Sequence, residues 1–229
     1  QAAQIAAAVS ACQSSLGEAA GEKYIYGKAL AVIFLSELDA DRHRTLIEKY
    51  GALLDAHRKP HGGYGYTSDP LGDTSQTQYA ALASWEMLQT GLRPDGQAMA
   101  ACANWLLRTQ SPEGGWGYRG RDPGDWERRD QTNTTPSMLS AGLSSVLICS
   151  DMLGVLKPGG GSGRTDIALP RNLPPELRPV ISQRRKRPQR LDGGEAVELA
   201  RVPQAWHEGR QWLDEHFTPD NGGHYSCYY

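Results

Sequence analysis

Residues 106–118 read Leu-Leu-Arg-Thr-Gln-Ser-Pro-Glu-Gly-Gly-Trp-Gly-Tyr, and this stretch decides the fold because it recurs. Residues 53–66 repeat it in outline as Leu-Leu-Asp-Ala-His-Arg-Lys-Pro-His-Gly-Gly-Tyr-Gly-Tyr. A weaker third copy, residues 213–225, ends in Gly-Gly-His-Tyr. Gly114 lies 52 residues after Gly62, a period that accommodates two helices and their connections. The sequence therefore predicts an array of repeated units.

The repeated turn has a direct physical interpretation. Paired glycines permit a positive φ and let the backbone pass close to a helix, where a β-carbon would collide. A Gln side chain offers two donors and an acceptor, enough to bind the unpaired backbone groups at helix ends. A Trp gives a large flat surface for packing against the neighbouring hairpin. We therefore predict a structural role for Gly62, Gly63, Tyr64, Gln110, Gly114, Gly115, Trp116 and Tyr118.

Helical periodicity fills the intervals between the turns. Before each turn runs an amphipathic stripe, formed by Leu46, Tyr50, Leu53 and Leu54, then by Met99, Cys102, Trp105 and Leu106, and then by Trp206, Leu213 and Phe217. After the first two turns, 73–75 and 133–136 offer capping oxygens and a Pro before helices that are apolar on most sides. Residues 1–16 form a further half-buried helix, and residues 24–38 a more buried one.

Outer and inner helices thus alternate along the chain. The sequence predicts an all-α fold, a toroid-like α/α array of about three and a half hairpins that forms an incomplete ring. We expect one repeat domain over 1–229 that belongs to a longer protein. Residues 157–203 break the pattern with seven prolines, six glycines, no aromatic residue and ten basic against five acidic side chains. They are expected to form a long irregular insertion.

Composition limits the function classes. With 39% hydrophobic and 22% charged residues, the 229-residue chain is typical of a globular protein. A net charge of −2 gives no basic field for nucleic acid, and the longest apolar run, 29–35, is too short to span a membrane. Cys12, Cys102, Cys149 and Cys227 have no metal-ligand spacing, so free thiols are favoured, although a disulfide stays open. No signal peptide is evident, and the compartment stays undetermined.

The repeat resembles the glycine–tryptophan (QW) repeat of the prenyltransferase and squalene-cyclase superfamily, whose members form an α/α toroid. Leu106, Gln110, Gly114 and Trp116 match its core, whereas the leading basic residue and glycine of the motif are missing. The first copy has His57 for Gln and Tyr64 for Trp. The resemblance covers the chain outside 157–203 and implies a terpenoid-cyclase-like fold.

The residues that such enzymes use are not found. Cyclases of this superfamily need Asp-x-Asp-Asp to protonate an alkene, and 39–42 read Asp-Ala-Asp-Arg in an expected connection between helices. Protein prenyltransferases carry an Asp, Cys and His zinc site, and the string 224–228 has no matching partner. His43, His57, His61 and His207 are interpreted as surface or turn histidines. We therefore predict no catalytic residue, no metal and no cofactor in this chain.

The helix ends offer a candidate ligand site. The N-terminal ends of the inner helices would place Asp73, Gln76, Asp130 and Asn133 near Tyr64, Tyr79 and Tyr118, a mixture suited to an apolar chain with a polar head. Against this, Asp73 and Asn133 are also good N-cap residues. The leading hypothesis is a module that binds an isoprenoid-like chain or a protein segment in its concave face, or a partner that completes the ring. Alternatives are an active isoprenoid transferase or cyclase with catalytic residues outside this chain, and a purely structural module.

Overall fold

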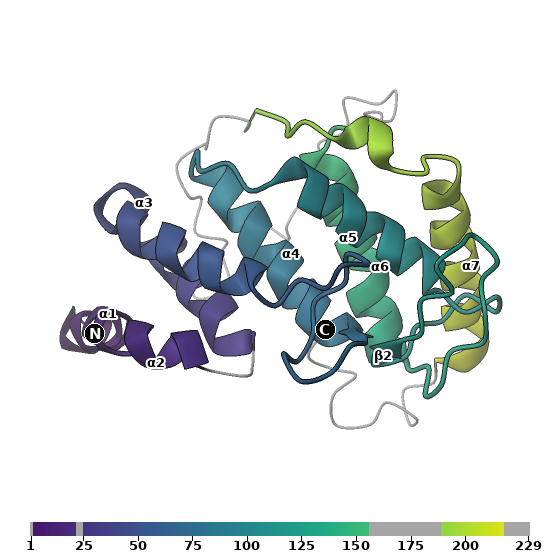
Figure 1. The fold of residues 1–229 in the computed structure, drawn as a ribbon, viewed down its shortest axis with the longest axis horizontal. Helices are drawn as coiled ribbons and strands as arrows, with labels where there is room; N and C mark the ends of the chain where they lie inside the picture. The colour runs from purple at the N-terminus through teal and green to yellow at the C-terminus, as the bar shows by residue number, and fades with distance from the viewer. Residues whose placement is uncertain (1, 22–24, 156–188, 218–229) are drawn as a thin grey trace, which may run out of the picture.

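The computed structural model describes residues 2–21, 25–155 and 189–217. The described chain is mostly helical, with one two-stranded sheet (Figure 1). Its helices are α1 (Ala2–Ser14), α2 (Leu16–Gly21), α3 (Tyr26–Asp55), α4 (Thr74–Gln89), α5 (Gly96–Arg108), α6 (Pro136–Met152) and α7 (Arg201–His216). Strand β1 (Gly72–Asp73) pairs antiparallel with β2 (Arg119–Gly120). The all-α class predicted from the helical periodicity is confirmed.

Helix α3 contains two predicted helices joined at Asp39. The backbone leaves the helical region there, with φ −169° and ψ 89°. The Asp39 carboxylate then accepts a hydrogen bond from the Arg42 N–H at 3.0 Å, so it caps the second half of the helix. Asp39 and Asp41 are exposed, in agreement with a hydrophilic connection rather than an acidic catalytic cluster.

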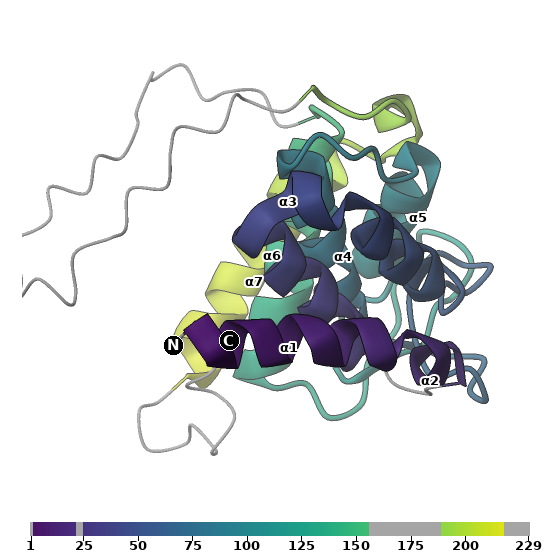
Figure 2. The ribbon, with the colours of Figure 1, turned by 90° about the vertical axis from the view of Figure 1, so that its left-hand side faces the viewer.

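The remaining helices alternate between two layers. Helix α4 packs against both α3 and α6, and α6 packs in turn against α5 and α7. In Figure 1, α5 lies nearer the viewer and α6 behind it. Figure 2 shows α1 running across the end of the molecule beside α3. Capping side chains fix where three of these helices begin: Asp73, Asp95 and Thr135 each accept a hydrogen bond from a backbone N–H of the first turn.

Two predictions about the C-terminal part need correction. Trp206 and Phe217 were expected in the buried stripe of the last outer helix, but they are 48% and 47% exposed. Helix α7 instead buries Val202, Ala205, Gly209 and Trp212. The Gly114 turn lies directly against this helix at Glu208 and Gly209, and this contact selects the face that is buried.

The predicted insertion, 157–203, is described only in part. Residues 189–200 lie against α5, where the Asn104 amide donates to the Ala196 carbonyl at 2.7 Å, and α7 already begins at Arg201. The rest of the insertion and the third repeat turn, 222–225, lie outside the described residues. None of the helices in the described ranges combines the length and apolar character needed to cross a membrane.

Candidate functional site

The two described repeat turns have the same backbone geometry. Gly62 and Gly114 have φ values of +104° and +105°. In the first turn the Lys59 N–H donates to the Gly63 carbonyl at 2.8 Å, and in the second the Ser111 N–H donates to the Gly115 carbonyl at 2.8 Å. The repeat deduced from the sequence is therefore present in three dimensions.

Each turn packs on the outer helix of the following hairpin. A β-carbon on Gly62 would collide with the Ala101 carbonyl of α5, and one on Gly114 with the Glu208 carbonyl of α7. These glycines have a positive φ as well, so both the space and the backbone exclude a side chain. The predicted close approach of backbone to helix is confirmed.

Trp116 packs inside its own hairpin rather than against the next one, which corrects the prediction. Its side chain is fully buried, its indole N–H donates to the Leu106 carbonyl of α5 at 2.9 Å, and its ring lies against Gly142 of α6. Tyr64 takes the corresponding place in the first copy and is 3% exposed. Tyr118 is 39% exposed and contributes its carbonyl, which accepts from the Thr74 N–H.

Two tryptophans outside the motif residues lie against the glycines of the described turns. Trp105 covers Gly63 of the preceding turn, and Trp212 covers Gly115. Each lies just before a leucine that the repeat alignment already matched, Leu106 or Leu213. This shared position was the signal that could have identified them.

Gln110 links its turn to the next outer helix, as its chemistry suggested. Its Nε2 donates to the Gly114 carbonyl at 2.9 Å and to the Ala205 carbonyl of α7 at 3.0 Å. Its Oε1 accepts from Arg128 at 3.0 Å, and Arg128 also pairs with Glu208 at 2.6 Å. The buried amide thus uses both of its N–H groups and one lone pair of its oxygen, and the bond to Ala205 joins its turn to α7.

His57 occupies the corresponding position in the first copy and is 3% exposed, so it is a turn residue but not a surface one. Its Nε2 lies 2.8 Å from Lys28 Nζ, and its Nδ1 lies 3.2 Å from the Gly65 carbonyl. An ammonium group only donates, so His57 accepts at Nε2 and donates from Nδ1. The pair joins α3 to the first repeat turn.

Among the predicted ligand residues, Asp73 is 8% exposed and caps α4. Its carboxylate accepts from the Gln76 N–H at 2.9 Å and from the Ser75 hydroxyl, which is also 2.8 Å from the Tyr26 hydroxyl. Burial raises the pKa of Asp73, and the hydrogen bonds from Ser75 and Gln76 partly offset the rise.

Gln76 and Tyr79 lie on the same helix. Gln76 is fully buried, and neither atom of its side-chain amide has a hydrogen-bond partner among the described residues. Tyr79 is half-buried and packs edge-on against Tyr26, with ring centroids 5.0 Å apart.

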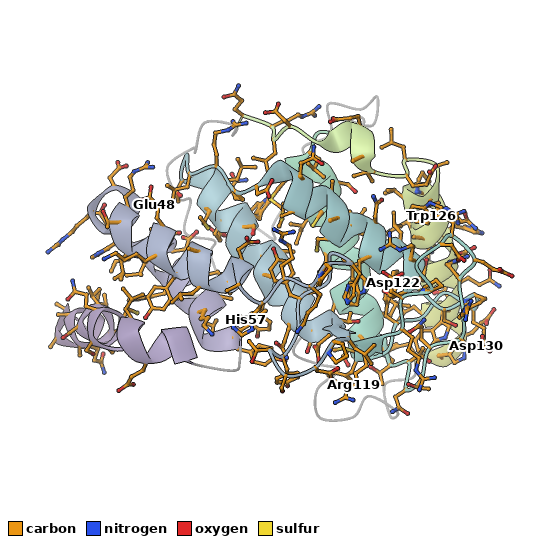
Figure 3. The ribbon with its side chains drawn as sticks, viewed as in Figure 1. Glu48, His57, Arg119, Asp122, Trp126 and Asp130 are labelled. Atoms are coloured by element: carbon orange, nitrogen blue, oxygen red, sulfur yellow. The ribbon has the colours of Figure 1, made fainter. Side chains whose placement is uncertain are left out.

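Asp130 and Asn133 are both exposed in the loop that precedes α6. Thr135, and not Asn133, caps that helix, because its hydroxyl accepts from the Met138 N–H at 3.2 Å. Asn133 instead has a φ of 56° in the loop. Figure 3 shows Asp130 on the α7 side of the molecule and His57 on the α3 side.

On each of α3, α4 and α6, a set of residues at helical spacing, most of them partly exposed, forms a stripe on one face. On α4 the stripe contains Gln78, Leu82 and Trp85, at spacings that place them on one face. On α3 it contains Leu30 and Phe34, and on α6 it contains Ser140, Ser144, Leu147 and Ile148. Leu30 is 53% exposed. We call the apolar members Leu30, Phe34, Leu82, Trp85, Leu147 and Ile148 the inner face.

The opposite side of α4 is covered by the outer helices. Ala80 lines a cavity together with Leu54 of α3 and Ala98 of α5, and a helix of 3.6 residues per turn points Leu82 and Trp85 away from that side. No group of three metal-ligating side chains occurs in the described ranges.

A comparison with protein-family models gave no match, and searches of the curated proteins and of the solved structures found none either. The resemblance to the prenyltransferase and squalene-cyclase repeats stays an expectation drawn from the sequence motif alone.

Proposed function

We propose that this chain is a toroid-like α/α repeat module, related to prenyltransferases and terpene cyclases, that binds an isoprenoid-like apolar chain on its inner face. The observation that carries the proposal is the inner face itself, because partly exposed apolar side chains lie in the stripes of three helices, α3, α4 and α6, of which α4 packs against both of the others. Extended apolar surface is the feature that an apolar chain would cover.

The ends of the stripes suggest where a polar head would lie. Gln78 lies one turn before Leu82 on α4, and Ser140 lies two turns before Leu147 on α6. Gln78 is 9% exposed, and its Oε1 has no partner among the described residues. A ligand hydroxyl would satisfy this buried acceptor. We therefore assign the polar end of the ligand to Gln78, on the stripe itself, in preference to Asp130 and Asn133.

The proposal is tested by measuring the binding of farnesol and geranylgeraniol to the intact chain. Fluorescent analogues of the two alcohols report binding, because a bound analogue is excited by energy transfer from tryptophan. We expect Leu82→Gln and Leu147→Gln to weaken binding roughly tenfold, since each introduces an amide into apolar surface. Leu199→Gln is the matched control, because Leu199 is 50% exposed outside the inner face. Binding that is equal in all three variants would contradict the proposal.

A second arm separates binding from catalysis. The chain is incubated with prenyl diphosphates and with squalene, with and without zinc. The proposal expects no turnover. Turnover that is lost in Asp73→Asn would favour the transferase or cyclase hypothesis instead. If the chain binds an apolar peptide but neither of the two alcohols, a protein-binding module is favoured.

A further inference from the structure

A cavity of about 220 Å³ lies between α3, α4 and α5, on the side of α4 away from the inner face. Its walls are largely apolar, and they include two thioethers. Its mouth carries the carboxylates of Asp55 and Asp95. The lining residues are Gly51, Leu54, Asp55, Tyr64, Ala80, Ser84, Met87, Pro94, Asp95, Ala98 and Met99.

Tyr64 supplies a polar group to this apolar cavity. Its side chain belongs to the first repeat turn and is 3% exposed. The hydrogen bonds of Tyr64 are made by its backbone, for example from its N–H to Thr77 Oγ1 at 3.0 Å. Within the described residues its hydroxyl group has no hydrogen-bond partner. A hydroxyl of a buried residue that lines a cavity without a protein partner is suited to bind a ligand.

The charge at the mouth favours a cation. Asp55 is already paired with Arg58, at 2.8 Å, and Asp95 caps α5 through the Gln97 N–H at 2.9 Å. Both carboxylates remain exposed, and no Lys or Arg is among the lining residues. Two carboxylates against one guanidinium leave a negative potential at this opening.

The cavity walls favour a ligand with a small aromatic group. Met87 and Met99 are flexible and polarisable, and methionine sulfur makes favourable contacts with aromatic rings. The cavity is smaller than the roughly 300 Å³ at which typical ligand pockets begin, so a compact ligand fits better than an extended chain.

We propose that this cavity is a binding site for a small arylalkyl amine, with the ring between Met87 and Met99, the ammonium group at Asp95, and the Tyr64 hydroxyl as a hydrogen-bond partner. The site is separate from the inner face, and it does not depend on the proposed function.

The test uses the intact chain with ¹³C-labelled methionine methyl groups and titrates it with 2-phenylethylamine. The Met87 and Met99 signals are expected to shift and to saturate. Met138 and Met152, buried in α6, are internal controls that should not move. The uncharged 2-phenylethanol should bind roughly tenfold more weakly, because it lacks the attraction to the carboxylates.

Two variants locate the binding. Asp95→Asn keeps a good N-cap residue but removes the charge, so amine affinity should fall severalfold while the chain stays folded. Ser84→Leu should block the cavity. Asp41→Asn, at an exposed carboxylate on α3, is the matched control and should bind normally. No saturable shift of Met87 and Met99, equal affinity for amine and alcohol, or unchanged binding in Asp95→Asn or Ser84→Leu would each overturn the proposal.

Discussion

The indole ring of Trp105 lies directly on Gly63: a β-carbon on this glycine would come within 2.6 Å of the ring. Trp212 has the same relationship to Gly115, where the corresponding distance is 3.0 Å. A flat ring against a residue without a side chain is therefore the repeated contact between successive hairpins, and it explains why both copies keep two adjacent glycines.

Gly63→Ala should destabilise the protein by about 1–3 kcal/mol, because the added methyl group overpacks the Trp105 contact. Gly27→Ala is the control: it lies in the first turn of α3 and has nothing within 4 Å of the added carbon. Urea denaturation compares the two. Equal midpoints for both variants would show that the ring and the glycine are not in close contact.

Trp116→Ala should cost on the order of 3–5 kcal/mol, since it removes a fully buried ring and the hydrogen bond to the Leu106 carbonyl. Trp206→Ala, at a tryptophan that is 48% exposed, should change the free energy of unfolding by less than about 0.5 kcal/mol. Thermal melts of both variants measure the contrast. An unchanged melting temperature for Trp116→Ala would refute the packing described for this ring.

Gln110→Ala should destabilise by about 1–3 kcal/mol, because two carbonyls and one guanidinium lose a buried partner. Arg128 shares this network, so the double variant with Arg128→Ala should lose less than the sum of the two single variants. A thermodynamic cycle from chemical denaturation gives the coupling. Strict additivity would mean that Gln110 and Arg128 act independently.

The environment of Asp122 predicts that the free energy of unfolding depends on pH. Burial by itself would raise the pKa of Asp122, but the hydrogen bonds from Arg108 and from the Gly124 N–H outweigh this, and the net pKa is lowered. A carboxylate with a lowered pKa in the folded state stabilises above its unfolded pKa of about 3.9, and this contribution is lost as the pH falls through the folded value. The stability advantage of the native chain over Asp122→Asn should therefore be full near pH 7 and shrink below about pH 4.

The matched control for this titration is Asp41→Asn, since the Asp41 side chain is 94% exposed and 3.8 Å from Arg44. Its free energy of unfolding should differ little from that of the native chain, because an exposed ion pair contributes little to stability. If the free energy of unfolding of Asp122→Asn differs from that of the native chain by the same amount at every pH, the Arg108–Asp122 pair is not the source of the acid sensitivity.

Cys102 and Cys149 should resist alkylation in the native state. Both are fully buried, and the side-chain hydrogen bond with Cys149, together with burial, raises the pKa of the Cys102 thiol. Of the three cysteines in the described ranges, Cys12 is only half-buried and should react first. Peptide mapping after iodoacetamide treatment, with and without urea, distinguishes them. Rapid native labelling of Cys102 would contradict the packing of α5 on α6.

The helices were predictable because capping residues and apolar spacing are local signals. Asp73 and Pro136 mark helix starts in the sequence as clearly as they do in the structure. The face that α7 buries was not predictable, since it depends on the Gly114 turn from another part of the chain. Trp206 fits the helical pattern as well as Trp212 does, and only the contact with Gly115 distinguishes them.

The candidate site was predictable only in part. Asp73 caps α4, and Gln76 and Tyr79 follow on this helix at intervals of three residues, so their proximity follows from helix geometry alone. Asp130 and Asn133 reach the solvent because the loop before α6 is long, and loop paths carry little sequence signal. The cavity at Tyr64 depends on how α3 and α5 approach α4, which a single sequence does not encode locally.

The order in which the turns close has a consequence for synthesis of the chain. Gly62 meets its helix only when Ala101 has been made, and Gly114 only when Glu208 has been made. During synthesis on the ribosome, the turn of each of these two hairpins therefore emerges before the helix that it packs against. The contact forms only when the next hairpin has been made. Translation pauses between hairpins would expose unfinished turns to chaperones, and truncation after α6 should leave the second turn open although every residue of that turn is present.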